Sequence, residues 1–219
     1  MHISIKNYED IIRLIKLKIE DQNLNKFPKI IAVTKTFTLD NILPLIEYGH
    51  LDYGENKVQE AVDKWSKIKI RKPEIKLHLI GKLQTNKVKF AIKIFDYIHS
   101  VDSIKLAKKI SDEQKKQNKK VKIFIQVNIG SEQQKSGVDI DKIGGLLNFC
   151  EELKLDVIGL MCIPPANQKA SKYFEKMKIL NNKFNLQQIS MGMSSDYLEA
   201  VANDATFLRI GSSIFGKRY

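Results

Sequence analysis

Short apolar segments alternate with helical patterns along the whole chain, and this alternation constrains the fold more than any other feature. Strands that alternate with helices form parallel sheets, because each strand returns through a crossover helix. Helices are expected before the first strand and between the strands, beginning with 8–22 and including 57–65 and 168–184. Apolar, β-branched runs bounded by turn residues predict the strands. They lie at 30–34, 51–53, 76–80, 97–100, 121–127, 156–160, 188–190 and 206–210.

This number of strands predicts an α/β fold, a closed (β/α)8 barrel of the TIM type that forms a single domain over residues 1–219. The length lies at the lower end of the range for such barrels, roughly 200 to 400 residues. An open doubly wound sheet is the main alternative, but it usually carries a GxGxxG motif after its first strand. No such motif follows 30–34, so the barrel is favoured.

Lys35 ends the first expected strand, Lys29-Ile-Ile-Ala-Val-Thr-Lys35. Lysine is almost never fully buried without a partner, so a charged amine at the tip of an apolar strand is unusual. A partly desolvated amine becomes a nucleophile for carbonyl groups. A lysine that simply reaches solvent is the alternative from this segment alone, and the residues at the other strand ends favour the nucleophile.

In a barrel, functional groups gather at the carboxyl ends of the strands, on the loops that lead into the helices. Reading only those positions gives a set of polar and small residues that follow most of the expected strands. They are Lys35, Asn56, Gly81, Gln84, Asn86, Asn128, Met161, Ser194, Ser195, Arg209, Gly211 and Ser212.

The loops after the seventh and eighth strands are rich in small and hydroxyl residues. Gly192-Met-Ser194-Ser195 and Gly211-Ser212-Ser213 each precede a helical segment. Small residues let backbone N–H groups approach an anion, and barrel phosphate sites are often built from these two loops. Either loop alone could be an ordinary helix cap, but two of them on adjacent strands predict a phosphate cradle.

A lysine nucleophile together with a phosphate cradle predicts pyridoxal 5′-phosphate (PLP) as the cofactor, held as a Schiff base on Lys35. Arg209 would then lie near the pyridine nitrogen of the ring. A guanidinium is always charged, so it would oppose protonation of that nitrogen and leave the ring a weak electron sink. A plain salt-bridge role for Arg209 is the alternative.

Several segments carry a resemblance to a known family, in the same order along nearly the whole chain. The chain resembles the pyridoxal phosphate homeostasis proteins, single-domain relatives of the alanine racemase N-terminal barrel (fold type III of PLP proteins). The segments are Ala32-Val-Thr-Lys35, Tyr53-Gly-Glu-Asn56-Lys-Val-Gln-Glu60, His78-Leu-Ile-Gly-Lys-Leu-Gln-Thr-Asn86-Lys-Val-Lys89, Ile125-Gln-Val-Asn128, Gly159-Leu-Met161, Ser190-Met-Gly-Met-Ser-Ser-Asp196 and Phe207-Leu-Arg-Ile-Gly-Ser-Ser-Ile-Phe-Gly216.

The resemblance implies a role for each site residue. Lys35 carries the cofactor, Asn56 lies beside the ring and Arg209 faces the ring nitrogen. Met161 is counted among the cofactor-binding residues, and the phosphate is held by Ser194, Gly211 and Ser212. Two departures from the family pattern, Lys82 and Cys162-Ile-Pro-Pro165, are expected to alter the mouth of the site without touching these ligands.

The resemblance also implies a PLP carrier rather than an enzyme. Alanine racemases place a second base, a tyrosine from an additional β-domain of a partner subunit, opposite the cofactor lysine. This chain ends at Tyr219, directly after the last strand and its terminal helix, and no such domain fits. We expect a monomer that buffers PLP or delivers it to apo forms of PLP-dependent enzymes, with an amino-acid racemase as the alternative.

The net charge of +12 raises the question of nucleic-acid binding. Only four of the 37 Lys and Arg residues are Arg, and the lysines are spread over the expected solvent faces of helices. Specific nucleic-acid binders usually cluster basic residues and interleave Arg or aromatic residues. A nucleic-acid-associated protein is therefore the weaker alternative, and salt-sensitive unspecific binding is the form it would take.

The cysteines, the histidines and the hydropathy of the chain predict a cytoplasmic protein without a bound metal. Cys150 and Cys162 lack CxxC spacing and stand among apolar residues, which predicts buried thiols. The four histidines are scattered along the chain and are given no catalytic role. No apolar run approaches the ~20 residues that cross a membrane, and the N-terminus has no apolar signal core.

Overall fold

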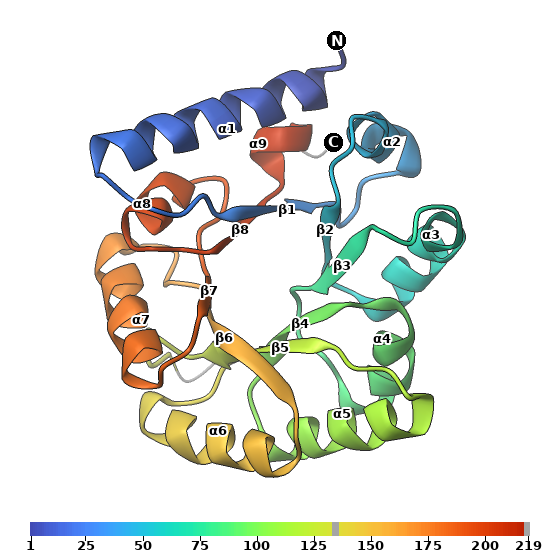
Figure 1. Ribbon diagram of the computed structural model, residues 1–219, viewed down its shortest axis with the longest axis vertical. Helices are drawn as coiled ribbons and strands as arrows, with labels where there is room; N and C mark the ends of the chain where they lie inside the picture. Colours follow the sequence, from blue (N-terminus) through green and yellow to red (C-terminus); the bar gives the residue numbers. More distant parts are fainter. Residues whose placement is uncertain (133–135, 217–219) are drawn as a thin grey trace.

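Eight parallel strands close into a barrel in the order of the sequence, with β8 paired to β1 (Figure 1). The computed structural model describes residues 1–132 and 136–216. The closed barrel confirms the predicted (β/α)8 fold. Its strands are β1 (Lys29–Val33), β2 (Asp52–Glu55), β3 (Lys76–Leu79), β4 (Tyr97–Val101), β5 (Lys122–Val127), β6 (Asp156–Cys162), β7 (Gln188–Ser190) and β8 (Phe207–Ile210).

Helices surround the barrel as an outer layer, because each strand is followed by a helix that packs back onto the sheet (Figure 1). Two short 3-10 turns, η1 (Thr85–Lys87) and η2 (Ile140–Lys142), lead into α4 and α6. The helices are α1 (Ile3–Asp21), α2 (Leu39–Glu47), α3 (Val58–Arg71), α4 (Val88–Ile94), α5 (Ile104–Gln117), α6 (Ile143–Glu152), α7 (Ser171–Lys183), α8 (Tyr197–Ala202) and α9 (Ser212–Phe215).

The apolar residues form two separate cores. The larger core lies between the strands and the helices and includes Trp65, whose side chain is fully buried. The smaller core fills the barrel interior with Ile31, Phe124, Met161 and Phe207. Side chains alternate between the two faces of a strand, so every second residue of each strand points into the barrel.

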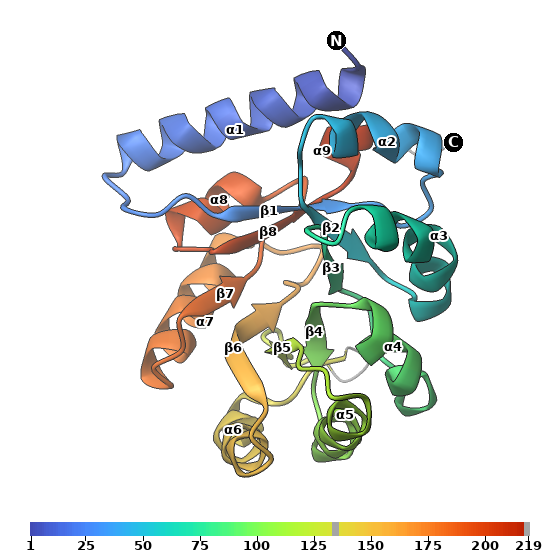
Figure 2. The ribbon, with the colours of Figure 1, turned by 45° about the vertical axis from the view of Figure 1, so that its right-hand side comes forward.

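Helix α1 precedes the first strand and lies along the outside of the barrel, against α2, α8 and α9 (Figure 2). Ile11 and Ile15 are its buried apolar residues, four positions apart on one face. His2 caps the helix, because its ring nitrogen accepts a hydrogen bond from the Ser4 backbone N–H. This packing places α1 next to the short α9, which follows the last strand.

The expected elements are all present, with shifted ends. Helix α1 begins at Ile3 rather than residue 8, because its first turn is held by the His2 cap rather than by buried apolar residues. Helix α3 continues past Trp65 to Arg71 through a largely exposed, lysine-rich stretch that has helix propensity but little apolar pattern. Strand β6 runs to Cys162, so Met161 lies within the strand rather than after it.

Within residues 1–132 and 136–216, no helix combines the length and apolar character needed to cross a bilayer. Cys150 and Cys162 are both buried free thiols, as predicted. Burial raises the pKa of the Cys162 thiol to about 12, so the thiol is protonated at neutral pH. The expectation that no second domain follows the barrel is based on the position of Tyr219. This residue lies outside the described residues.

Candidate functional site

The predicted site residues come from five strands, and most of them lie at the carboxyl end of the barrel, because all eight strands are parallel. Lys35 lies half-buried in the turn after β1, and Asn56 lies half-buried directly after β2. Ser194 lies in the loop after β7, Arg209 is buried within β8, and Gly211 and Ser212 begin α9. Met161 is fully buried on β6.

The turn that carries Lys35 is held on both sides by residues of α3. Lys64 Nζ donates to the Thr34 backbone carbonyl at 2.8 Å, just before Lys35. Glu60 Oε1 accepts from the Thr36 backbone N–H at 2.7 Å, just after it. Thr36 has a φ of +69°, in the left-handed region that β-branched residues rarely adopt. The contacts with α3 therefore hold a strained turn in which Lys35 has a fixed backbone position.

Glu55, at the end of β2, anchors this arrangement. Its side chain is fully buried, and Oε1 accepts hydrogen bonds from Thr34 Oγ1 at 2.8 Å, Lys64 Nζ at 2.9 Å and Trp65 Nε1 at 2.9 Å. Three donors on one carboxylate oxygen offset the cost of burying the charge. Strand β2 and helix α3 thus jointly fix the end of β1.

Lys64→Met is expected to destabilise the protein by about 3–5 kcal/mol, because it leaves the buried Glu55 carboxylate without its countercharge. Urea unfolding followed by circular dichroism measures the loss. Lys142→Met is the matched control, since Lys142 pairs with Asp139 on the surface and exposed pairs contribute about 1 kcal/mol or less. Equal stability changes in the two variants would show that Glu55 does not depend on Lys64.

Asn56 is placed by a close backbone contact. A Cβ atom on Gly81, in the loop after β3, would lie 2.3 Å from the Asn56 carbonyl oxygen, so only glycine fits there. The sequence indicates Gly81 only by its position after the third strand, and this close contact explains why a glycine is needed there. The loops after β2 and β3 are therefore packed against each other at the mouth of the barrel.

The loops after β7 and β8 meet as predicted for a phosphate cradle. Ser194 Oγ accepts from the backbone N–H of Gly211 at 3.3 Å and of Ser213 at 3.2 Å. Gly192 adopts a φ of +88°, which turns the first loop toward the second. Two backbone N–H groups at the start of α9 therefore converge on the Ser194 hydroxyl, which joins the two loops. Ser212 is exposed, and Ser213 also reaches the Ser194 carbonyl through its hydroxyl.

Arg209 projects into the barrel interior from β8 and is 4% exposed. Its guanidinium donates from Nη1 to Ser190 Oγ at 2.7 Å and from Nη2 to the Cys162 backbone carbonyl at 2.8 Å. Burial lowers the pKa of Arg209, but arginine starts so high that the group keeps its charge. These two bonds use two of its five N–H donors, which leaves capacity for a ligand.

The contact with Cys162 corrects one expectation. The Cys162–Pro165 segment does touch an inferred cofactor ligand, because the Cys162 carbonyl accepts a hydrogen bond from Arg209. The contact is made by the backbone, so the identity of the side chain gives no signal of it. Lys82, the other departure from the family pattern, is exposed in the loop after β3.

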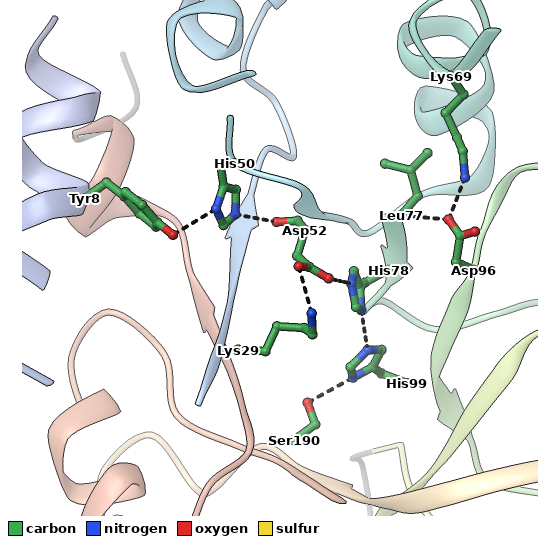
Figure 3. Close-up of polar contacts among 10 residues, drawn as sticks. All are labelled: Tyr8, Lys29, His50, Asp52, Lys69, Leu77, His78, Asp96, His99 and Ser190. Carbon is green, nitrogen blue, oxygen red and sulfur yellow. Dashed lines mark hydrogen bonds and ion pairs between the residues drawn. The ribbon is translucent and has the colours of Figure 1, made fainter. Parts of the chain in front are cut away.

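The three buried histidines are the residues that sequence reasoning passes over. His78 on β3 and His99 on β4 lie 3.0 Å apart through their ring nitrogens, inside the barrel (Figure 3). His50 lies nearby, between Tyr8 and the backbone of Asp52. The sequence does contain a signal for the position of His99. Tyr97 and His99 lie two positions apart in an apolar strand, so their side chains lie on the same face, which in the barrel is the inner one. In the described part of the chain, no cluster of His, Cys, Asp or Glu has the makings of a metal site.

Comparison with known proteins agrees with the barrel fold. The family model for the alanine racemase N-terminal domain matches residues 16–219. A pyridoxal phosphate homeostasis protein of Haemophilus influenzae is 32% identical, over 97% of this chain and 96% of its own. The protein of the same name from Aquifex aeolicus is 36% identical over 87% of each chain.

A solved structure extends the likeness to three dimensions. PipY of Synechococcus elongatus PCC7942, solved with PLP bound, superposes with a TM-score of 0.80 at 31% identity. The match covers 92% of this chain and all of PipY. Because the family model and these relatives span most of the sequence, the chain belongs to the alanine racemase N-terminal domain family and, within it, to the pyridoxal phosphate homeostasis proteins.

Proposed function

We propose that this protein binds PLP at the carboxyl end of the barrel and serves PLP homeostasis, by buffering the cofactor or delivering it. The observation that carries the proposal is the position of Lys35 directly after β1 and of the Gly211 and Ser213 backbone N–H groups directly after β8, because these two strands pair with each other. A Cβ on Gly211 would lie 3.3 Å from Val33, so the two loops approach closely. The PLP-bound structure of PipY supports the same reading.

In this proposal each residue keeps the role expected from the sequence. PLP, when bound, supplies an aldehyde that condenses with an amine and a ring that withdraws electrons. Lys35 holds it as a Schiff base, Asn56 lies beside the ring, and Arg209 faces the ring nitrogen. Ser194, Gly211 and Ser212, with Ser213, hold the phosphate, and Met161 closes the barrel interior beneath the site.

The phosphate contacts give a prediction about affinity. Replacing Ser194 and Ser212 together by alanine is expected to weaken PLP binding more than tenfold, because each hydrogen bond to a charged group contributes roughly 1.5–3 kcal/mol. Equilibrium titration followed by absorbance measures this. Pyridoxal without phosphate is the control ligand and should bind poorly to both proteins. If the wild type binds pyridoxal and PLP equally well, the cradle is not a phosphate site.

We further propose that the protein turns over no substrate. The observation that favours a carrier is the buried, permanently charged Arg209, which opposes protonation of a ring nitrogen beside it and so weakens the ring as an electron sink. The amino-acid racemase alternative needs a second base opposite the cofactor lysine. Relatives at 32–36% identity carry the name of homeostasis proteins rather than of enzymes.

One experiment separates the two functions. The PLP-loaded protein is incubated in turn with D- and L-amino acids and with the apo form of a PLP-dependent enzyme. The carrier proposal predicts recovery of the second enzyme's activity and no measurable racemisation or transamination. Sustained turnover of any amino acid would support the racemase alternative instead.

The setting of the protein completes the proposal. We propose that residues 1–219 work as one PLP-binding domain, as a monomer in the cytoplasm, with apo PLP-dependent enzymes as recipients. Specific nucleic-acid binding is not part of the proposal, because only four of the 37 basic residues are arginines and one of these, Arg209, is buried in the barrel.

A further inference from the structure

A continuous line of buried hydrogen bonds crosses the barrel interior from Arg209. Five residues, here called the polar path, form it: Arg209, Ser190, His99, His78 and Asp52. The four links measure 2.7 Å from Arg209 Nη1 to Ser190 Oγ, 2.9 Å from Ser190 Oγ to His99 Nδ1, 3.0 Å from His99 Nε2 to His78 Nδ1, and 3.0 Å from His78 Nε2 to Asp52 Oδ1. Figure 3 shows the part of the path from Ser190 to Asp52.

The path exists because its members point inward from strands that the barrel brings together. Asp52, His78 and His99 come from consecutive strands β2, β3 and β4, while Ser190 and Arg209 come from β7 and β8. His78 stacks on Tyr97 at 4.2 Å and His99 on Phe124 at 4.3 Å between ring centroids. The aromatic rings therefore fix both imidazoles in orientation and keep water away from them.

Burial and charge select one arrangement of protons in the lower half of the path. Burial acts to raise the pKa of Asp52, but its hydrogen bonds to His78 and Lys29, with the charge of Lys29, outweigh burial and hold the pKa below its ordinary value. Asp52 is therefore ionised and can only accept. Burial outweighs the pull of Asp52 and lowers the pKa of His78, so this imidazole is neutral and carries its single proton on Nε2.

The upper half follows from this start. With its proton on Nε2, His78 can only accept at Nδ1, so His99 must donate from Nε2. Burial, followed by the nearby His78 and Arg209, holds the pKa of His99 well below its ordinary value. His99 is therefore neutral and accepts at Nδ1, where the Ser190 hydroxyl donates. Ser190 in turn accepts from Arg209 Nη1, so all four hydrogen bonds point from the cation to the anion.

This order matters because Arg209 is a buried cation with no direct countercharge. Among the described residues, no carboxylate lies within ion-pair distance of its guanidinium. A buried unpaired charge is costly, and hydrogen bonds that all point the same way polarise one another. The path thus connects Arg209 to the Asp52 carboxylate, which itself pairs with Lys29 at 3.1 Å.

We propose that Ser190, His99, His78 and Asp52 are positioning residues that hold the Arg209 guanidinium in one orientation toward the cofactor ring. Ser190 fixes Nη1, and the directed chain behind it fixes Ser190. The effect on the cofactor ring rests on the proposed PLP site. The order of protons along the path does not, because it is a property of the protein without ligand.

The first test uses the protein without PLP. Long-range proton–nitrogen NMR spectra distinguish the two neutral forms of an imidazole from each other and from the charged form. We expect His78 and His99 both to be neutral with the proton on Nε2 at pH 7.5, with assignments from His78→Gln and His99→Gln. A proton on Nδ1 of either ring, or a charged ring, would overturn the proposal.

The second test measures the consequence at the cofactor. Ser190→Ala removes the first link and is expected to weaken PLP binding about tenfold or more, since it removes a hydrogen bond to a charged group. The absorption band of bound PLP should also shift, because the charge beside the ring is no longer fixed. Ser190→Thr keeps the hydroxyl and should restore both properties toward the wild type.

Ser100→Ala is the matched control, because Ser100 is a buried serine on β4 whose hydroxyl has no hydrogen-bond partner among the described residues. If Ser190→Ala binds PLP with the affinity and the spectrum of Ser100→Ala, the positioning role is wrong. If the wild type does not bind PLP at all, the proposed function fails, while the NMR result still decides the proton order. Should Ser190→Ala not fold, the NMR spectra of the wild type decide the proposal.

Discussion

Lys35→Ala is expected to give a folded protein that no longer develops the visible absorption band of bound PLP. Alanine has no amine to condense with the aldehyde, so the band should disappear completely rather than weaken. The fold should persist because the turn is held by the backbone of Thr34 and Thr36, through Lys64 and Glu60. Absorbance after addition of PLP, together with circular dichroism, measures both properties.

Two other lysines near the mouth of the barrel serve as controls. Lys57 follows Asn56 and Lys82 follows Gly81, and both side chains are exposed. Lys57→Ala and Lys82→Ala should each keep the visible band. The assignment of Lys35 is wrong if Lys35→Ala still forms an adduct that borohydride traps at one defined lysine.

Stability is expected to fall steeply as the pH drops below about 6.5. Burial lowers the pKa of His50 to about 4, and it also holds those of His78 and His99 below their ordinary value of 6.5. Between pH 6.5 and these lower folded-state pKa values, the unfolded chain binds protons on the three histidines that the folded protein does not, so protonation favours unfolding. His50 alone should contribute a loss of about 1.4 kcal/mol between pH 7.5 and 5.5, because its folded-state pKa lies below this range. His78 and His99 should add to the loss in the same direction.

Urea unfolding at pH 7.5 and pH 5.5 measures this loss, which is a measurable part of the usual total stability of roughly 5–15 kcal/mol. His50→Gln removes one of the three groups and should reduce the difference between the two pH values by about 1.4 kcal/mol. His2→Gln, at the exposed cap of α1, should leave the difference unchanged. Stability that is the same at both pH values would mean that the buried histidines are protonated in the folded state.

The sequence predicts the barrel and most of the site for a simple geometric reason. All strands are parallel, so the residues that follow them in the sequence meet at one end of the barrel. This rule brings Lys35, Asn56 and Ser194 to the same face without any knowledge of the register between strands. Arg209 needs one further step, since it lies within β8 and reaches the interior because alternate residues point inward.

The rest of the site depends on contacts that no local pattern encodes. Lys64 is one lysine among many in α3 and elsewhere, and only the packing of α3 against the end of β1 brings its amine to the Thr34 carbonyl. His78 and His99 are 21 positions apart, and their ring nitrogens meet because neighbouring strands put both on the inner face. The bond from Arg209 to the Cys162 carbonyl is invisible to sequence because any residue supplies a carbonyl.

Identification of the lysine that carries PLP tests the central claim most directly. The wild-type protein is loaded with PLP, reduced with sodium borohydride, digested and analysed by mass spectrometry. The proposed site predicts that the phosphopyridoxyl mass is found on the peptide containing Lys35. It also predicts that an excess of inorganic phosphate, present while PLP is added, reduces the amount of this labelled peptide. Labelling spread over many surface lysines, or concentrated on a lysine other than Lys35, would contradict the assignment of the site.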